Sequence, residues 1–302
     1  MAPGPWAPAH RARHSVSGPR HQGAGGAGIG QPGLGAQESG RPQTAEAWAI
    51  DLIRTPLLAD KLAMGRPPRA FESRPTPRPQ VRPGRDPALE IRARAPKTPK
   101  PGALVRPQAR AEVLHRFLHH ELQAAELCAW AVLAYPDAPE RLRRGLLAIA
   151  RDELRHAGLY LLQVQRLGHD YGSFPVRDWF WERVPTASGI VEFLALVALG
   201  LEGGNLEHAR DFAQRLERAG DREAAATVAQ VGEEEIAHVR FGRRWFERLA
   251  GPLEFQTWTA RLPPPLTPLV LRGKPLHRSA RRRAGQSEAF LDELEAWQPS
   301  GS

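Results

Sequence analysis

The chain has 302 residues, which is enough for one large domain or two ordinary ones. Residues 1–110 contain 18 of the 29 prolines and 13 of the 28 glycines, a bias typical of disordered chain rather than of a packed core. The formal charge of +9 is also uneven, because residues 1–110 carry 18 basic and 7 acidic side chains whereas residues 111–302 carry 24 and 26. These figures exclude a uniformly basic fold and predict one folded domain of about 190 residues after a basic tail.

Cysteine usage and hydropathy exclude several further classes of protein. The single cysteine, Cys128, excludes an internal disulfide, a redox pair of cysteines and a thiolate zinc site. Residues 1–40 contain no apolar core of a secretory signal. The longest apolar runs are interrupted by Glu126 or Glu192 before they reach the roughly 20 residues that a membrane span needs. We therefore expect a cytoplasmic protein with no membrane-embedded segment.

Composition divides the chain before the main domain into three segments. Residues 1–43 are expected to be a disordered Gly/Pro-rich tail. Residues 44–64 are amphipathic and predict a short docking helix, broken at Pro56. Residues 65–108 return to a Pro/Arg-rich composition that is typical of an extended linker.

Four long helices are predicted over residues 109–251, because apolar residues there repeat with the helical period of 3.6. The expected ranges are Arg110–Tyr135, Ala138–Gly168, Ser188–Gly220 and Asp221–Gly251. Ser188 and Asp221 are expected to be N-caps, while Gly168 and Gly220 are expected to end helices. The connections are short, long and short, so the predicted fold is an all-α four-helix bundle with one long crossover at residues 169–187.

Residues 252–302 are expected to form a C-terminal extension. Its segment 261–283 contains seven basic residues and no acidic residue. Ser287 is predicted to cap a last short helix that ends near Trp297.

Two Glu-x-x-His motifs are the strongest chemical signal in the sequence. Glu153 and His156 lie in the second predicted helix, and Glu235 and His238 lie in the fourth. Residues three apart share one helix face, with Cβ atoms about 5–6 Å apart, so each pair can bind one metal ion. Apolar residues flank both pairs at helical spacing, which predicts that both pairs point into the core.

The first helix offers two carboxylates that could lie level with these pairs, Glu121 and Glu126. Residues at one level of an antiparallel helix pair are equally far from the turn between the helices. The midpoint of 121 and 153 is 137, inside the turn Pro136–Pro139, whereas 126 and 153 give 139.5. This argument favours Glu121.

The third helix offers Glu202 and Glu207. Glu202 continues an apolar stripe that includes Ala198 and Leu199. Glu207 shares its face with polar residues such as Arg210, so we expect Glu207 to be solvated and choose Glu202.

The metal-ligand set predicted in this way is Glu121, Glu153, His156, Glu202, Glu235 and His238. Four ionised carboxylates in one apolar core are unfavourable unless cations compensate their charge, and two divalent ions balance four carboxylates. Imidazole and carboxylate ligands suit iron or manganese. The sequence therefore predicts a dinuclear centre of two iron ions, with an iron–manganese pair or manganese alone as alternatives.

Four stretches of this chain resemble a bacterial ferritin-like family catalogued as domain of unknown function 455. They are HRFLHHELQAAEL, RRGLLAIARDELRHAGLY, FPVRDWFWERVP and EEEIAHVRFGRRWF. The resemblance covers residues 110–250 and extends to 44–63, and all six predicted ligands match ligand positions. It implies the ferritin-like superfamily, in which two helices each supply a Glu and two each supply a Glu-x-x-His motif. It also implies binding and two-electron reduction of O₂ or peroxide, but the family's reaction is unknown.

Other residues near the predicted centre have two interpretations each. Tyr160 follows His156 by four residues and is either a catalytic, redox-active phenol or an ordinary core tyrosine. Gly203 and Gly204 also have two interpretations. They leave room for O₂ or substrate or mark a local distortion of the helix, or else they allow tight backbone packing.

Residues beside the first helix and in the crossover are also ambiguous. His119 and His120 are expected at the surface or as hydrogen-bonding neighbours of a metal ligand. The aromatic residues 179–181 are expected to cover the bundle, with a pocket lid as the alternative.

Four functions are compatible with the sequence. The favoured one is an O₂- or peroxide-activating oxidoreductase that acts on a small molecule. It takes electrons from a separate donor or from the substrate, because the chain has no cysteine pair. Iron storage or peroxide detoxification is the second, although long flanks do not favour a storage shell; a homodimer is compatible with the sequence. The third is an RNA-directed hydroxylase that binds nucleic acid through basic residues such as Arg278 and Arg281–Arg283. The fourth is a structural bundle stabilised by metal.

Overall fold

The computed structural model describes residues 42–94 and 98–299. The chain divides into two units, residues 1–40 and 41–302, and the second contains all of the described residues. Within the described ranges the regular secondary structure is helical, with one isolated bridge between Ile91 and Val176 and no strand, which confirms the predicted all-α class. No described helix is long and apolar enough to cross a membrane. The tail predicted for residues 1–43 lies, up to residue 41, outside the described residues.

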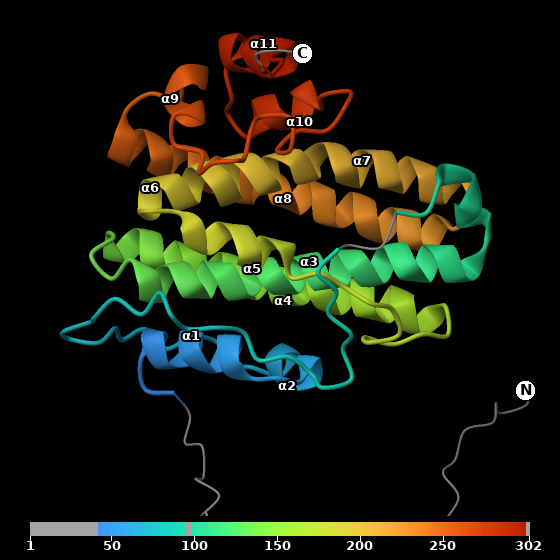
Figure 1. The fold of residues 1–302 in the computed structure, drawn as a ribbon, viewed down its shortest axis with the longest axis horizontal. Helices are drawn as coiled ribbons and strands as arrows, with labels where there is room; N and C mark the ends of the chain where they lie inside the picture. The colour runs from blue at the N-terminus through green and yellow to red at the C-terminus, as the bar shows by residue number, and fades with distance from the viewer. Residues whose placement is uncertain (1–41, 95–97, 300–302) are drawn as a thin grey trace, which may run out of the picture. The chain divides into compact units, whose positions relative to one another are not determined.

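Four long helices form the centre of the fold (Figure 1). They are α3 (Pro107–Ala134), α4 (Glu140–Arg166), the continuous helix made by α6 (Ile190–Phe193), η3 (Leu194–Leu201) and α7 (Glu202–Arg218), and α8 (Arg222–Ala250). Helices α3 and α4 pack as one hairpin and α7 and α8 as another. The crossover between the hairpins contains α5 (Trp179–Arg183) and η2 (Val184–Thr186). The four helices predicted from the 3.6-residue period are therefore present, with ends within three residues of the expected positions.

Most of the predicted helix ends have the expected chemistry. The Asp221 side chain accepts a hydrogen bond from the Ala224 backbone at 3.1 Å. Gly168 and Gly220 have φ angles of 81° and 83°, a left-handed conformation in which glycine carries no Cβ penalty. The N-cap predicted at Ser188 is wrong, because Gly189 occupies that position and no side chain caps the helix.

The turns directly before Glu202 have π-helical rather than α-helical geometry. Segment η3 consists of the apolar run LALVALGL, and Glu202 directly follows it. The Ala195 carbonyl in this segment accepts a hydrogen bond from Trp258 Nε1 at 2.9 Å. The helix distortion that we considered near Gly203 and Gly204 is therefore present, but it lies before Glu202, in η3.

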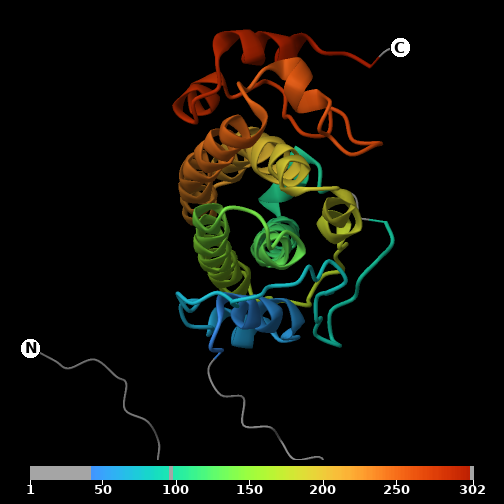
Figure 2. The ribbon, with the colours of Figure 1, turned by 90° about the vertical axis from the view of Figure 1, so that its left-hand side faces the viewer.

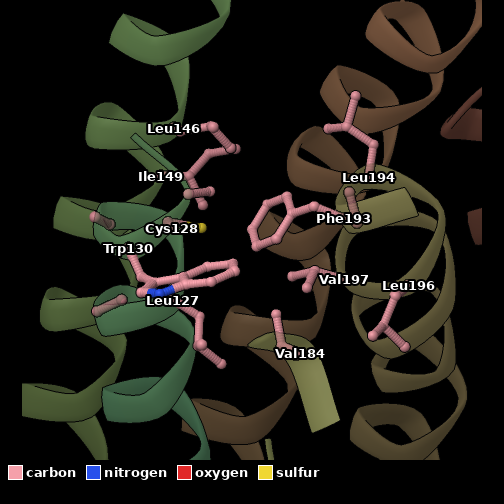
Figure 3. Close-up of a cluster of buried hydrophobic side chains, with 14 of the residues drawn as sticks. Leu127, Cys128, Trp130, Leu146, Ile149, Val184, Phe193, Leu194, Leu196 and Val197 are labelled. Atoms are coloured by element: carbon pink, nitrogen blue, oxygen red, sulfur yellow. The ribbon is translucent and has the colours of Figure 1, made fainter. Parts of the chain in front are cut away.

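The core at one end of the bundle is aromatic and aliphatic (Figure 3). The Trp130 and Phe193 rings, from α3 and α6, meet with centroids 6.4 Å apart. Cys128 is buried as a free thiol beside them, as expected for a small core residue.

Two sets of short helices lie on opposite sides of the bundle (Figure 2). On one side are α1 (Ala45–Arg54) and α2 (Leu58–Leu62), which contact α3 and α4 and are separated at Pro56 as predicted. On the other side are α9 (Phe255–Thr259), α10 (Arg278–Arg283) and α11 (Glu288–Ala296), of which α10 contacts α7 and α8. The Ser287 side chain caps α11 through the Phe290 backbone, as predicted.

The segment predicted as an extended linker, residues 65–108, packs against the bundle where it is described. Its described residues before α3 form no helix except η1 (Pro101–Val105), but Val81 and Leu89 are buried. The Arg92 backbone donates to the Val176 carbonyl at 2.8 Å, which ties this segment to the crossover. Isolated apolar residues in a Pro-rich stretch have no periodicity, so the sequence did not reveal this packing.

Candidate metal centre

The structure brings all six predicted ligands into one buried cluster in the middle of the bundle. We call these residues the carboxylate–imidazole cluster: Glu121 from α3, Glu153 and His156 from α4, Glu202 from α7, and Glu235 and His238 from α8. Each residue is at most 7% exposed. Glu121, Glu153, His156 and Glu235 each offer a ligand atom within 4.8 Å of the others, and this group could hold a metal ion. Glu202 belongs to the same cluster, because, besides burial, the charges of Glu235 and Glu153 act on its carboxyl group and help to raise its pKa.

The two histidines present the same nitrogen to the carboxylates. Nδ1 of His156 lies 3.2 Å from oxygens of both Glu153 and Glu235. Nδ1 of His238 lies 2.9 Å from Glu153 Oε1 and 2.8 Å from Glu235 Oε2. One ring nitrogen carries at most one hydrogen and cannot bond two carboxylates well. Ligand atoms that share a small octahedral ion, with bonds of about 2.1 Å, lie about 3 Å apart, so this spacing fits neighbouring metal ligands.

The buried carboxylates also leave unsatisfied oxygens. Oε1 of Glu153 and Oε1 of Glu235 are buried without a hydrogen bond. A buried acceptor without a partner is costly, and a carboxylate more so. A bound cation would satisfy these two oxygens, so the residues present fit a metal centre.

The electrostatics of the six side chains show how strongly the cluster attracts positive charge. Burial and the neighbouring carboxylates raise the pKa values of Glu121 and Glu202 well above their usual range. Burial disfavours the charged form of His156, yet the adjacent Glu153 and Glu235 carboxylates raise the pKa of His156 to about 10. Protons held in this way compete with metal ions for the same atoms, so metal binding would release protons.

A further carboxylate lies behind each histidine. Nε2 of His156 lies 2.8 Å from Oε2 of Glu234 on α8, and Nε2 of His238 lies 3.5 Å from Oδ2 of Asp152 on α4. A carboxylate on the outer nitrogen fixes the orientation and tautomer of a metal-binding imidazole. Sequence reasoning missed Asp152 and Glu234. Their signal is the acidic residue that directly precedes each Glu-x-x-His motif. The packing of α4 against α8, which belong to different hairpins, places each of these residues next to the other motif's histidine.

Glu126, the carboxylate rejected on α3, lies outside the cluster in a network of its own. It is fully buried and accepts hydrogen bonds from Lys61 Nζ at 2.8 Å, Arg85 Nη1 at 2.6 Å and Trp181 Nε1 at 2.7 Å. Arg85 also pairs with Asp178 at 3.1 Å. The charge on Glu126 is thus neutralised by the N-terminal segment and not available to the cluster.

The expectation that Glu207 is solvated is wrong. Glu207 is 2% exposed and forms a buried ion pair with Arg281, at 2.7 Å. It also accepts from the Gly273 and His277 backbones. The C-terminal extension covers this face of α7, and that cover could not be inferred from the polar neighbours of Glu207 in sequence.

The glycines after Glu202 lie in closely packed surroundings. A Cβ on Gly203 would lie 3.2 Å from Arg281 Nη1, and a Cβ on Gly204 would lie 3.1 Å from the Leu271 carbonyl. These close contacts support the tight-packing interpretation, while the local helix distortion considered as the alternative lies in η3, directly before Glu202.

The remaining candidates differ in their distance from the cluster. Tyr160 is buried, and burial together with the Glu121 charge raises the pKa of its phenol well above the usual range. Its catalytic role stays a prediction. His119 is buried and not at the surface, because Asp178 and Tyr171 bind its two nitrogens at 3.0 and 2.7 Å. His120 is half-buried beside Glu121.

The fold and the cluster define an all-α protein with a buried Glu/His site that could hold metal. The chain belongs to the family described as "Protein of unknown function (DUF455)", whose model matches residues 44–292. It is 29% identical over 164 residues to an uncharacterized protein of Haemophilus influenzae. That alignment covers 52% of this chain and 57% of the relative. No solved structure matches the chain.

Proposed function

We propose that this chain is a ferritin-like protein whose carboxylate–imidazole cluster holds two iron ions, or an iron–manganese or manganese pair. We further propose that it is an oxidoreductase that uses O₂ or peroxide. The observation that carries the proposal is the pair of Nδ1 atoms, each 2.8–3.2 Å from two buried carboxylates. Two helices each supply one Glu, and the other two each supply a Glu-x-x-His motif. This distribution agrees with the ligand pattern of that superfamily.

The chain's own residues would perform distinct parts of this function. Bound iron would supply two-electron reduction of O₂ or peroxide. Glu153 and Glu235 each lie close to both histidines, so each would contribute to metal binding beside His156 and beside His238. Asp152 and Glu234 would orient His238 and His156. The apolar walls would exclude water and protect the site from side reactions.

Electrons and substrate would come from outside the chain. The only cysteine, Cys128, is 2% exposed, so a cysteine pair is not available to relay electrons. A separate electron donor and an unidentified small-molecule substrate are therefore part of the proposal. Tyr160 is proposed as the catalytic phenol, since it is buried within the field of Glu121. A cytoplasmic location is also proposed, and it agrees with the scarcity of cysteine.

The structure weakens the support for RNA binding by the C-terminal extension. The four C-terminal arginines named for that alternative each form an ion pair with a carboxylate of this chain; these are Arg278, Arg281, Arg282 and Arg283. The alternative of a purely structural metal site makes a different prediction about redox chemistry, and the following experiment separates it from the proposal.

The test is stopped-flow absorption of anaerobic, iron(II)-loaded protein mixed with O₂ or hydrogen peroxide. We expect oxidation of the iron in the wild-type protein and in Glu233→Gln, a variant on the exposed side of α8. Iron that stays reduced in the presence of both oxidants would overturn the oxidoreductase and leave a structural role.

A further inference from the structure

A small pocket adjoins the cluster on the side formed by α3 and α7. Glu121 and Glu202 line it, together with His120, Asn205 and Phe180 of the crossover helix α5. Helices α4 and α8, which carry the histidines, contribute no lining residue. Two larger pockets, near Lys100 and near Arg218, include no member of the cluster. This pocket therefore reaches two ligand carboxylates from the side opposite the imidazoles.

The size of the pocket limits what it can hold. Its volume is about 30 Å³. A cavity of about 10–15 Å³ on this measure holds one water molecule, and pockets for drug-sized molecules start at roughly 300 Å³. The pocket thus has room for about two water molecules or one diatomic molecule. His120 and Asn205 give it polar groups that can hydrogen-bond such a ligand.

The Phe180 ring lines the pocket beside His120. The two rings are stacked, with centroids 5.0 Å apart and planes at 28°. Phe180 is half-buried, so part of the residue is in contact with solvent.

Buried hydrogen bonds to α3 fix the position of this ring. The Phe180 backbone donates to Gln123 Oε1 at 3.2 Å, and Gln123 is fully buried. The adjacent Trp181 donates through Nε1 to Glu126 at 2.7 Å, and Glu126 is itself bound by Lys61 and Arg85. The backbone that carries the ring is therefore anchored to α3, and moving helix α5 away from the pocket would require breaking contacts in the Glu126 network.

We propose that this pocket is the binding site for the oxidant and that Phe180 restricts the site to molecules the size of O₂ or hydrogen peroxide. An organic molecule would then not reach the metal ligands and would be oxidised, if at all, from outside the pocket. This inference rests on the proposed function and narrows its substrate class.

The test measures ligand binding and not turnover. Iron(II)-loaded protein is titrated with nitric oxide, which is diatomic, and with tert-butyl isocyanide, which binds ferrous iron but is bulky, and binding is followed by visible absorption. The variants are Phe180→Ala and Phe180→Leu, and the matched control is Phe174→Ala. Phe174 lies in the same crossover, but its ring packs on His169 and His115, away from the pocket. Metal content is measured for every protein.

We expect the wild-type protein and Phe174→Ala to bind nitric oxide and to bind the isocyanide weakly. Phe180→Ala should gain about tenfold or more in isocyanide affinity at unchanged nitric oxide affinity, and Phe180→Leu should gain less. If Phe180→Ala does not fold, the Phe180→Leu result decides. Equal isocyanide affinity in wild type and Phe180 variants would overturn this inference alone. A wild-type protein that takes up no iron would overturn both this inference and the proposed function.

Discussion

His156 on α4 and Glu234 on α8 face each other at 2.8 Å, from Nε2 to Oε2, behind the carboxylate–imidazole cluster. Arg155 also pairs with Glu234. The opposite nitrogen of His156 points at Glu153 and Glu235. The imidazole is thus held between carboxylates on both sides, which is the arrangement expected of a metal-binding histidine with an orienting partner.

Removal of this orienting charge should weaken metal binding. We predict that Glu234→Gln lowers iron affinity about 10- to 100-fold, because the ring then loses its fixed orientation and part of its basicity. The measurement is competition with a calibrated chelator. Glu233→Gln is the matched control, since Glu233 is the adjacent residue but is exposed and pairs with Arg283. Equal affinity in both variants would contradict the orienting role.

Glu126 should contribute to stability and not to metal binding. Glu126→Ala leaves Lys61 and Arg85 buried without their main partner. Loss of one partner of a buried ion pair costs about 3–5 kcal/mol, so the free energy of unfolding in urea should fall by about this amount.

The exposed pair of Arg283 and Glu233 provides the control for Glu126. Arg283→Ala should leave the free energy of unfolding unchanged within error, since both side chains are more than half exposed. Iron content per folded chain should be unchanged in Glu126→Ala. Loss of iron at full stability would contradict the separation of Glu126 from the cluster.

Asp178 should make stability depend on pH in the acidic range. Burial opposes its ionisation, but the hydrogen bond from His119 and the charge of Arg85 lower the pKa of Asp178 from 3.8 to about 2. A lowered carboxyl pKa stabilises the folded protein above the unfolded value, and this stabilisation disappears as the pH falls from about 4 to about 2. The shift corresponds to about 2 kcal/mol at pH 7.

The measurement is urea unfolding of wild type and Asp178→Asn at several pH values. The difference in free energy of unfolding should be about 2 kcal/mol at pH 7 and should shrink between pH 4 and pH 2. A difference that stays constant over this range would show that Asp178 acts through shape rather than charge.

Gly242 permits the close approach of α8 to η3. A Cβ at this position would lie 2.2 Å from the Ala198 Cβ, so Gly242→Ala should destabilise the fold by about 1–3 kcal/mol in thermal or urea unfolding. Gly65→Ala is the control, because a Cβ on Gly65 would meet no atom within 4 Å. That variant should leave stability unchanged or raise it by about 0.4–1 kcal/mol. Equal stability of the two variants would show that the helices can separate without cost.

The sequence predicted the bundle because the buried face of an amphipathic helix is visible in the sequence as apolar residues that repeat every 3.6 positions. The helical period and the distance from the turn together predicted that Glu121, and not Glu126, lies beside the Glu-x-x-His motifs. The structure places Glu121 in the cluster and pairs Glu126 with Lys61. The run that forms η3 is apolar on all sides, so it carries no phase from which a π-helix could be inferred.

Contacts between distant parts of the chain escaped prediction. Glu207 is buried by Arg281, which lies 74 residues further on, and no local pattern around Glu207 signals that cover. Arg85 reaches Glu126 from a Pro-rich stretch that has no periodicity. Asp152 and Glu234 could have been found, because each directly precedes a Glu-x-x-His motif and the packing of α4 against α8 brings each next to the other motif's histidine.

The most direct test of the central claim is metal content by plasma mass spectrometry on anaerobically purified protein. Wild type is compared with the double variant Glu153→Ala/Glu235→Ala and with Glu233→Ala as a control. We expect about two iron or manganese ions per chain in wild type and control, because two divalent ions balance four carboxylates, and none in the double variant. Near-zero metal in wild type after reconstitution with iron, or equal metal in all three proteins, would contradict a dinuclear centre in the carboxylate–imidazole cluster.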